Sequence, residues 1–171
     1  MSGAAYRDAV ALALAEGWSF GGLHAITTPA GPVVRALLVA PDGGARLESV
    51  PAVDGEVPSL VDLARAATWD EREAHDLYGI RFAGHEPLRP LLDHDPVLAR
   101  WTVPVRGKDA HQVAVGPIHA GVIESGHFRF HVVGDRILLL DARLGYKHRG
   151  LERAAEGRTL AEGLAYATRA C

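Results

Sequence analysis

The sequence has 171 residues, 48% hydrophobic and 23% charged, with a formal net charge of −3. These values allow one or two domains with a buried core and give no basic field that would attract nucleic acid. No apolar run approaches the ~18–20 residues of a membrane-spanning helix, and the single cysteine excludes an internal disulfide. We therefore expect a cytoplasmic protein.

One helix and three strands are predicted at the start of the chain. A helix is expected over residues 5–16, because its alanine-rich run stops before Gly17 and glycine commonly follows a helix. Three runs rich in apolar residues, bounded by proline and glycine turns, then predict strands at 19–28, 33–40 and 45–53. The Asp-Gly-Gly link before the last run favours a hairpin.

Two helices are predicted to follow these strands. Ser59 with Asp62, and Thr68 with Glu71, have the three-residue spacing of helix-capping pairs. The first helix would be short, and the second would end at Gly79. The first unit is therefore expected to be α+β, with one helix, a small antiparallel sheet and two further helices.

Prolines and weak periodicity mark residues 81–110. Such a segment predicts an extended connector, with a domain boundary near Gly107. We therefore expect a first domain at 1–92, a connector at 93–110 and a second domain at 111–171.

The second domain is expected to begin with strands and to end with a helix. Strands are predicted at 111–115, 127–133 and 136–142, the last two joined by a turn that begins at Gly134. Thr159 is expected to cap the final helix.

Histidines are concentrated in the middle of the chain, eight of the nine lying between His75 and His148. His127 and His131 would suit zinc only on a helix. On a strand they share a face but stand ~13 Å apart, at a rise of ~3.3 Å per residue. A self-contained zinc enzyme is therefore not expected.

The middle of the chain contains the segments Trp-Asp-Glu-Arg-Glu-Ala-His-Asp-Leu-Tyr-Gly, from Trp69, and Gly-His-Glu-Pro-Leu-Arg, ending at Arg89. Both segments resemble the small peripheral-arm (C) subunit of respiratory complex I. By themselves, these charged residues could form a solvated helix face, whose ion pairs would each stabilise the helix by about 0.3 kcal/mol. In that family the segment helps to bind neighbouring subunits. The resemblance therefore implies contacts with other subunits for Glu71, Arg72, Glu73, Asp76, His85 and Arg89.

Gly-Pro-Ile-His, ending at His119, resembles a loop of the complex I quinone-site (D) subunit, and the same region resembles the large subunit of membrane-bound NiFe-hydrogenases. A lone histidine on a turn is otherwise an ordinary surface residue. The resemblance implies that His119 binds a quinone headgroup or donates a proton. It makes His127 a second candidate cofactor-binding residue.

Ile-Glu-Ser-Gly-His-Phe-Arg, from Ile123, resembles the hydrogenase sequence Arg-Ile-Glu-Gly-His-Leu-Arg, with Ser125 inserted. This match implies that Glu124 passes protons near nickel, a role that suits a carboxylate of raised pKa. The alternative is a loop carboxylate paired with Arg129 or His127.

Two further segments complete the resemblance. Gly-Tyr-Lys-His-Arg-Gly, from Gly145, is similar to an element of both relatives and implies an interface with an iron–sulfur subunit through His148 and Arg149. Arg-Ala-Cys, ending at Cys171, resembles the first nickel-binding motif, in which this thiolate would be one ligand. The other cysteines of that NiFe site lie outside the sequence.

The expected function is that of the N-terminal part of a fused hydrogenase-like large subunit, in which the hydrogenase domain is truncated. It would perform two-electron redox chemistry with an iron–sulfur partner, on the inner face of the membrane and in contact with membrane subunits only indirectly. One alternative is a C/D subunit of an NADH-quinone oxidoreductase that forms a quinone pocket. Another is a non-catalytic assembly module whose residues 1–92 dock the iron–sulfur subunit.

Overall fold

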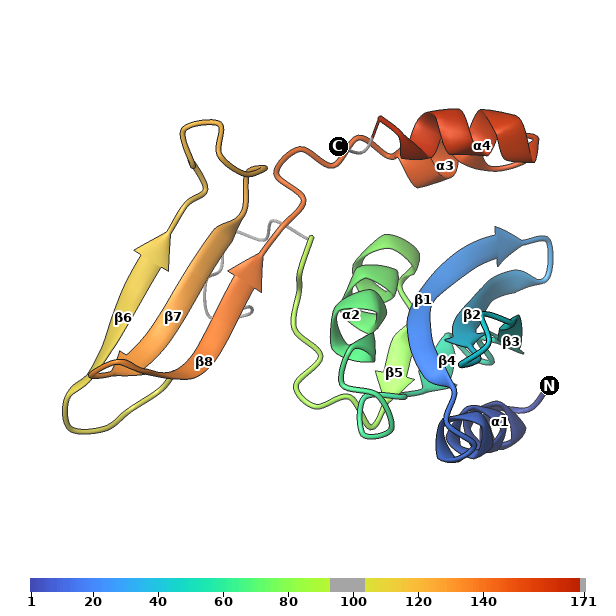
Figure 1. Cartoon of the computed structure of the whole chain (residues 1–171), viewed down its shortest axis with the longest axis horizontal. Helices are drawn as coiled ribbons and strands as arrows, with labels where there is room; N and C mark the ends of the chain where they lie inside the picture. The colour runs from blue at the N-terminus through green and yellow to red at the C-terminus, as the bar shows by residue number, and fades with distance from the viewer. Residues whose placement is uncertain (93–103, 170–171) are drawn as a thin grey trace.

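The computed structural model describes residues 1–92 and 104–169 and has the expected α+β architecture (Figure 1). Its elements, in chain order, are α1 (Gly3–Ala15), β1 (Ser19–Thr28), β2 (Gly31–Val39), β3 (Ala45–Pro51), β4 (Glu56–Pro58), α2 (Ala67–Tyr78), β5 (Arg81–Ala83), β6 (Ala110–Val115), β7 (His127–Val133), β8 (Arg136–Arg143), α3 (Leu151–Ala155) and α4 (Leu160–Ala167).

An antiparallel sheet in the order β1-β2-β3 forms the centre of the first unit. The main apolar core contains Tyr6 and Val10 of α1, Leu38 of β2 and Phe82 of β5, all buried. Its other buried members also lie before residue 83. Burial of this apolar surface supplies the main stabilisation of the first unit.

The first helix and three strands agree closely with the sequence prediction. Ser2 caps α1 by accepting a hydrogen bond from Ala5 N–H, and Gly17 follows the helix with a φ of +88°. The Asp-Gly-Gly link forms a tight turn, in which Ala40 N–H donates to Gly44 O at 2.7 Å. Local turn and capping chemistry is sufficient to place these elements.

The predicted short helix after Ser59 is wrong, as is the predicted cap of the next helix. Residues 61–66 form isolated turns, and α2 begins at Ala67 without a side-chain cap. The Ser59 hydroxyl instead donates to Glu71, and the Thr68 hydroxyl donates to Arg65 O. Glu71, the expected partner of Thr68, is thus bound by Ser59 and Leu60, while the Thr68 hydroxyl bonds to a carbonyl three residues earlier. The end of α2 at Gly79, in the left-handed conformation, is as predicted.

Three short elements, β4, β5 and α3, were not predicted. Strand β5 has three residues and pairs in parallel with β4, for example Val57 with Phe82. Helix α3 has five residues and contacts α4. Elements of this length carry too little periodicity for recognition from sequence.

The second unit contains an antiparallel sheet in the order β6-β7-β8, which stands apart from the first sheet with α2 between them (Figure 1). The expected alternation of faces along β7 fails at a register shift between His131 and Val132, both of which are buried. The predicted capping of α4 is confirmed, because Thr159 and Glu162 form a reciprocal capping box.

Few apolar side chains are buried in the second unit. Within the described residues 104–169, these are Val132 and Ala142. Larger apolar residues, among them Ile118, Val122 and Leu160, are more than four-fifths exposed. The division into domains at 93–110 stays a prediction, and residues 93–103 lie outside the described part of the chain.

Candidate functional site

Helix α2 directs Glu71 into the interior of the first unit. Its fully buried carboxylate accepts hydrogen bonds from the Ser59 hydroxyl at 2.8 Å and from Leu60 N–H at 2.6 Å. The Nδ1 atom of buried His85 lies 2.8 Å from the same carboxylate. A buried carboxylate needs such partners to offset its lost hydration, so Glu71 joins three separate segments of the first unit.

Arg72 connects α2 with the second unit. The buried side chain donates to the carbonyl oxygens of Arg89 at 2.8 Å and Pro90 at 2.7 Å, and more weakly to that of Ala142 in β8 at 3.4 Å. Burial, together with the nearby charge of Arg89, lowers the pKa of Arg72 to about 10. The guanidinium stays protonated at neutral pH and can keep all three carbonyl contacts.

Asp76, four residues after Arg72, holds the same connecting segment from the same side of α2. Its carboxylate accepts hydrogen bonds from the N–H groups of Leu91 at 2.7 Å and Leu92 at 2.6 Å. Leu91 O in turn accepts from Leu144 N–H at 2.8 Å, just beyond β8. We refer to Arg72 and Asp76 as the α2 clamp, because together they fix residues 89–92 between the helix and the second unit.

A buried charged group, Asp141 of β8, makes further contacts between the units. Its carboxylate pairs with Arg89 and lies 2.8 Å from the Nε2 atom of His131. The side-chain nitrogen of Gln112 lies 3.3 Å from the other ring nitrogen of His131. Burial, with the charges of Arg129 and Arg89, lowers the pKa of His131. A neutral His131 can then donate a hydrogen bond from its Nε2–H group to the Asp141 carboxylate.

The structure shows what four of the predicted interface residues bind within this chain. Glu71, Arg72 and His85 are at most 5% exposed and bind groups of this same chain, so they offer almost no surface to another subunit. Arg89, only about one-sixth exposed, binds the second unit of the same chain. These four residues are therefore largely occupied by contacts within this chain, and the subunit contacts expected for the remaining residues stay a prediction.

The loop between β6 and β7 holds His119 and Glu124 in different surroundings. The Nε2 atom of the partly buried His119 lies 2.7 Å from Gly126 O, and its ring centroid is 6.0 Å from that of Phe128. Glu124 is 58% exposed, and its carboxylate lies 3.3 Å from the Lys147 ammonium group. The structure thus pairs Glu124 with a cation that neither sequence alternative named.

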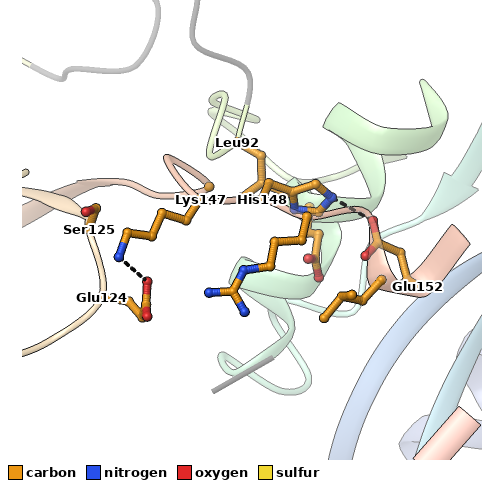
Figure 2. Close-up of a pocket in the computed structure, with 10 residues that line it drawn as sticks. Leu92, Glu124, Ser125, Lys147, His148 and Glu152 are labelled. Carbon is orange, nitrogen blue, oxygen red and sulfur yellow. Dashed lines mark hydrogen bonds and ion pairs between the residues drawn. The ribbon is translucent and has the colours of Figure 1, made fainter. Parts of the chain in front are cut away.

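A cavity of about 320 Å³ opens between this loop, α2 and the segment after β8 (Figure 2). We call it the interunit cavity. It is lined by Glu73, Leu92, Glu124, Ser125, Gly145, Lys147, His148, Arg149, Leu151 and Glu152. The loop and the Gly-Tyr-Lys-His-Arg-Gly segment, singled out separately in the sequence, thus contribute opposite walls of one cavity. His119 and His127 are not among its lining residues.

Charged groups of both signs line the interunit cavity. Figure 2 shows the Lys147–Glu124 pair on one side and His148 against Glu152 on the other, with His148 Nε2 and the Glu152 carboxylate 2.6 Å apart. Burial raises the pKa of Glu73, and the neighbouring carboxylates of Asp70 and Glu152 add to this rise. Glu73 is therefore easier to protonate than a fully solvated glutamate, a property suited to proton transfer.

The other predicted site residues have separate surroundings. Burial, with the charges of Arg129 and Arg143, lowers the pKa of His127. The Arg149 guanidinium, in the cavity wall, donates to Arg169 O at 2.5 Å and so links the start of α3 to the end of α4. Cys171, the predicted nickel ligand, lies outside the described residues.

The residues present do not by themselves fit a NiFe centre. The sequence has one cysteine, whereas the motif implies further cysteine thiolates as ligands. In the described ranges 1–92 and 104–169, no three His, Cys, Asp or Glu side chains are grouped closely enough to hold a metal ion. Such a centre would therefore need ligands from outside this sequence.

Sequence reasoning missed several residues that build the site. Lys147 stood within a recognised segment and Glu152 two residues beyond it, but neither had an assigned role, although the four-residue spacing of His148 and Glu152 favours a pair on a helix. Asp141 and Leu92 gave no signal, because their partners are distant in sequence.

One segment of the chain matches a known family of respiratory subunits. Residues 33–111 match the family model described as "Respiratory-chain NADH dehydrogenase, 30 Kd subunit". The chain therefore contains a complex I 30 kDa (C) subunit domain. This agrees with the resemblance seen from Trp69 to Arg89.

Curated relatives are named as hydrogenase or formate hydrogenlyase components and as NADH-quinone oxidoreductase subunits. Hydrogenase-4 component G of Escherichia coli (strain K12) is 35% identical across 64% of this chain and 24% of the relative, and formate hydrogenlyase subunit 5 of the same strain is 31% identical across 60% and 22%. The C/D subunit of the NADH-quinone oxidoreductase of Phocaeicola vulgatus is 28% identical across 67% of this chain and 29% of the relative.

These relatives support the assignment of a respiratory oxidoreductase subunit. The chain spans about a quarter of the length of the curated relatives that it matches. Among the described residues, no helix has the length and apolar character to span a membrane.

Proposed function

We propose that this chain supplies the N-terminal part of a hydrogenase-like large subunit in a membrane-associated respiratory oxidoreductase. A docking domain would be followed by the start of the redox domain, and the intact assembly would exchange two electrons with an iron–sulfur partner subunit. The main supporting observation is the interunit cavity, which brings the Glu124 loop and the segment from Gly145 to Glu152 together. The relatives named as hydrogenase components support the same proposal.

The role proposed for Glu124 is proton transfer. Its carboxylate is on the cavity wall, 3.3 Å from the Lys147 ammonium group, and a positioned carboxylate is a group that general acid–base catalysis can use. A NiFe centre, if the complete assembly carries one, would supply the electron chemistry, with Cys171 as one proposed ligand. The residues of this chain would contribute the proton-transferring carboxylate of Glu124 and the side chains of His148 and Arg149 in the cavity wall.

The second candidate is a C/D subunit of the NADH-quinone type, supported by the relative of that name. Quinone would then take the place of the metal centre, and His119 would contact the headgroup or donate its proton. The close contact of His119 with Gly126 O would have to open before its Nε2 atom could bind a ligand. A purely structural docking module is the third candidate, favoured by the well-formed core of the first unit.

The Glu124→Gln variant in the complete assembled oxidoreductase tests the proposal. Hydrogen turnover is expected to fall by about 10²-fold or more, the usual size of a lost general acid–base, while nickel and iron contents stay at wild-type values. Glu156→Gln, an exposed carboxylate outside the cavity, is the matched control. Unchanged hydrogen turnover in Glu124→Gln would remove this residue from the proton path. Quinone reduction without hydrogen turnover in the wild type would favour the second candidate.

A further inference from the structure

Helix α2 both anchors the connecting segment and contributes to the interunit cavity. Arg72 and Asp76 hold residues 89–92 through hydrogen bonds of 2.6–2.8 Å to backbone groups. Glu73, the residue after Arg72, lines the cavity. The position of this helix therefore affects one cavity wall directly and, through residues 89–92, a second wall indirectly.

The second wall is reached through Leu92 and Gly145. Leu92 lines the cavity, and its N–H donates to Asp76 at 2.6 Å. Gly145 has a φ of +76°, and a Cβ atom added there would lie 2.9 Å from Leu92 Cδ2. This distance is shorter than two carbon atoms normally approach, so the Leu92 side chain packs closely against the Gly145 backbone.

Gly145 also begins the turn that carries Lys147 and His148 to the cavity wall. Its carbonyl oxygen accepts a hydrogen bond from His148 N–H at 2.9 Å. The intervening Lys147 extends toward Glu124, as Figure 2 shows. A displacement of Gly145 would therefore move both Lys147 and His148.

We propose that the α2 clamp is a positioning device for the interunit cavity. Asp76 fixes Leu92, Leu92 seats against Gly145, and Gly145 sets the turn that holds Lys147 opposite Glu124. Arg72 stabilises the same path by anchoring Arg89 and Pro90. Arg72, Asp76 and Leu92 are thus positioning residues that act through other groups. Only the catalytic consequence of this arrangement rests on the proposed function.

The positioning is tested first in the 171-residue chain by backbone NMR and amide hydrogen exchange. In Asp76→Ala, the exchange protection of the Leu91 and Leu92 amides is expected to fall by at least about tenfold, because each loses a charged acceptor. The amide resonances of Lys147 and His148 are expected to shift in the same variant. Arg81→Gln, which breaks the exposed Arg81–Glu56 ion pair elsewhere in the first unit, should leave all four amides unchanged.

A second variant separates positioning from simple loss of stability. Leu92→Ala keeps the backbone hydrogen bond to Asp76 but removes the packing on Gly145. The amide at position 92 should stay protected while the Lys147 and His148 resonances move. Wild-type resonances for residues 147 and 148 in Leu92→Ala would overturn the proposal, even if Asp76→Ala fails to fold. Equal shifts in Arg81→Gln would also overturn it.

The catalytic consequence is measured in the assembled oxidoreductase. Leu92→Ala is expected to lower kcat by about tenfold or more, since small displacements of reacting groups reduce rates strongly, with KM for the electron donor unchanged. A normal kcat would overturn the catalytic part of the inference. The NMR measurements require no turnover, so a failure of the proposed redox function would show in Glu124→Gln and leave the positioning result standing.

Discussion

Replacement of Glu71 by alanine is expected to destabilise the first unit strongly. The carboxylate is fully buried and accepts from Ser59 and Leu60, with His85 as its third neighbour. Leu60 N–H is part of the backbone and cannot turn toward water. Leaving this donor without an acceptor costs about 1–3 kcal/mol by itself. Removal of one partner from a buried charged group costs about 3–5 kcal/mol in measured cases. We expect a loss of about 3 kcal/mol, a large share of the ~5–15 kcal/mol that holds a domain folded.

Urea unfolding followed by tryptophan fluorescence, to which the partly buried Trp18 contributes, measures this loss. Glu71→Gln keeps the volume and one acceptor oxygen, so its loss should be smaller, about 1–2 kcal/mol. Glu56→Ala removes an exposed carboxylate from the ion pair with Arg81 and should change stability by less than about 1 kcal/mol. A loss below about 1 kcal/mol in Glu71→Ala, at an unchanged urea dependence, would refute the assigned role of this carboxylate.

Two further predictions concern titration and capping. Folding raises the pKa of Glu73, so the folded state binds more protons than the unfolded state at pH values between the ordinary and the raised pKa. Stability should therefore fall as pH rises through that window. Glu73→Gln should flatten this fall and stabilise the protein at pH 7. Urea midpoints measured from pH 4 to pH 7 check this, and identical profiles for variant and wild type would contradict it. Thr159→Ala removes the capping box of α4 and should destabilise that helix by about 1 kcal/mol. Faster amide exchange at Leu164 would show this effect, whereas an unchanged rate would count against the cap.

Local patterns predicted the regular elements that have local causes. The turn at Gly43, the end of α2 at Gly79 and the capping of α4 by Thr159 each depend on residues within a few positions. The same patterns failed at Ser59 and Thr68, where the capping chemistry was satisfied differently. A serine hydroxyl has the same donor and acceptor whether it caps a helix or binds a distant carboxylate, and only the folded chain selects between these uses.

The candidate site was predicted in its parts and not in its assembly. Both cavity-forming segments were recognised from their resemblance to known subunits, and Glu124 was among the residues named. The contact of Glu124 with Lys147, and the exclusion of His119 from the cavity lining, depend on how the loop closes near Gly116. The sequence of this loop has no spacing that predicts either the Glu124–Lys147 contact or the position of His119.

The sequence by itself determined the class of protein, the α+β composition and the two segments that meet in the cavity. Tertiary structure decided the use of the charges on α2, because alternation and spacing identify a charged helix face but not its environment. Arg72, which the resemblance assigned to a contact with another subunit, is buried against carbonyl groups of its own chain. The electrostatic cost of burying a charge is offset only by partners brought close in space, and those partners come from positions 17 to 70 residues farther along the chain.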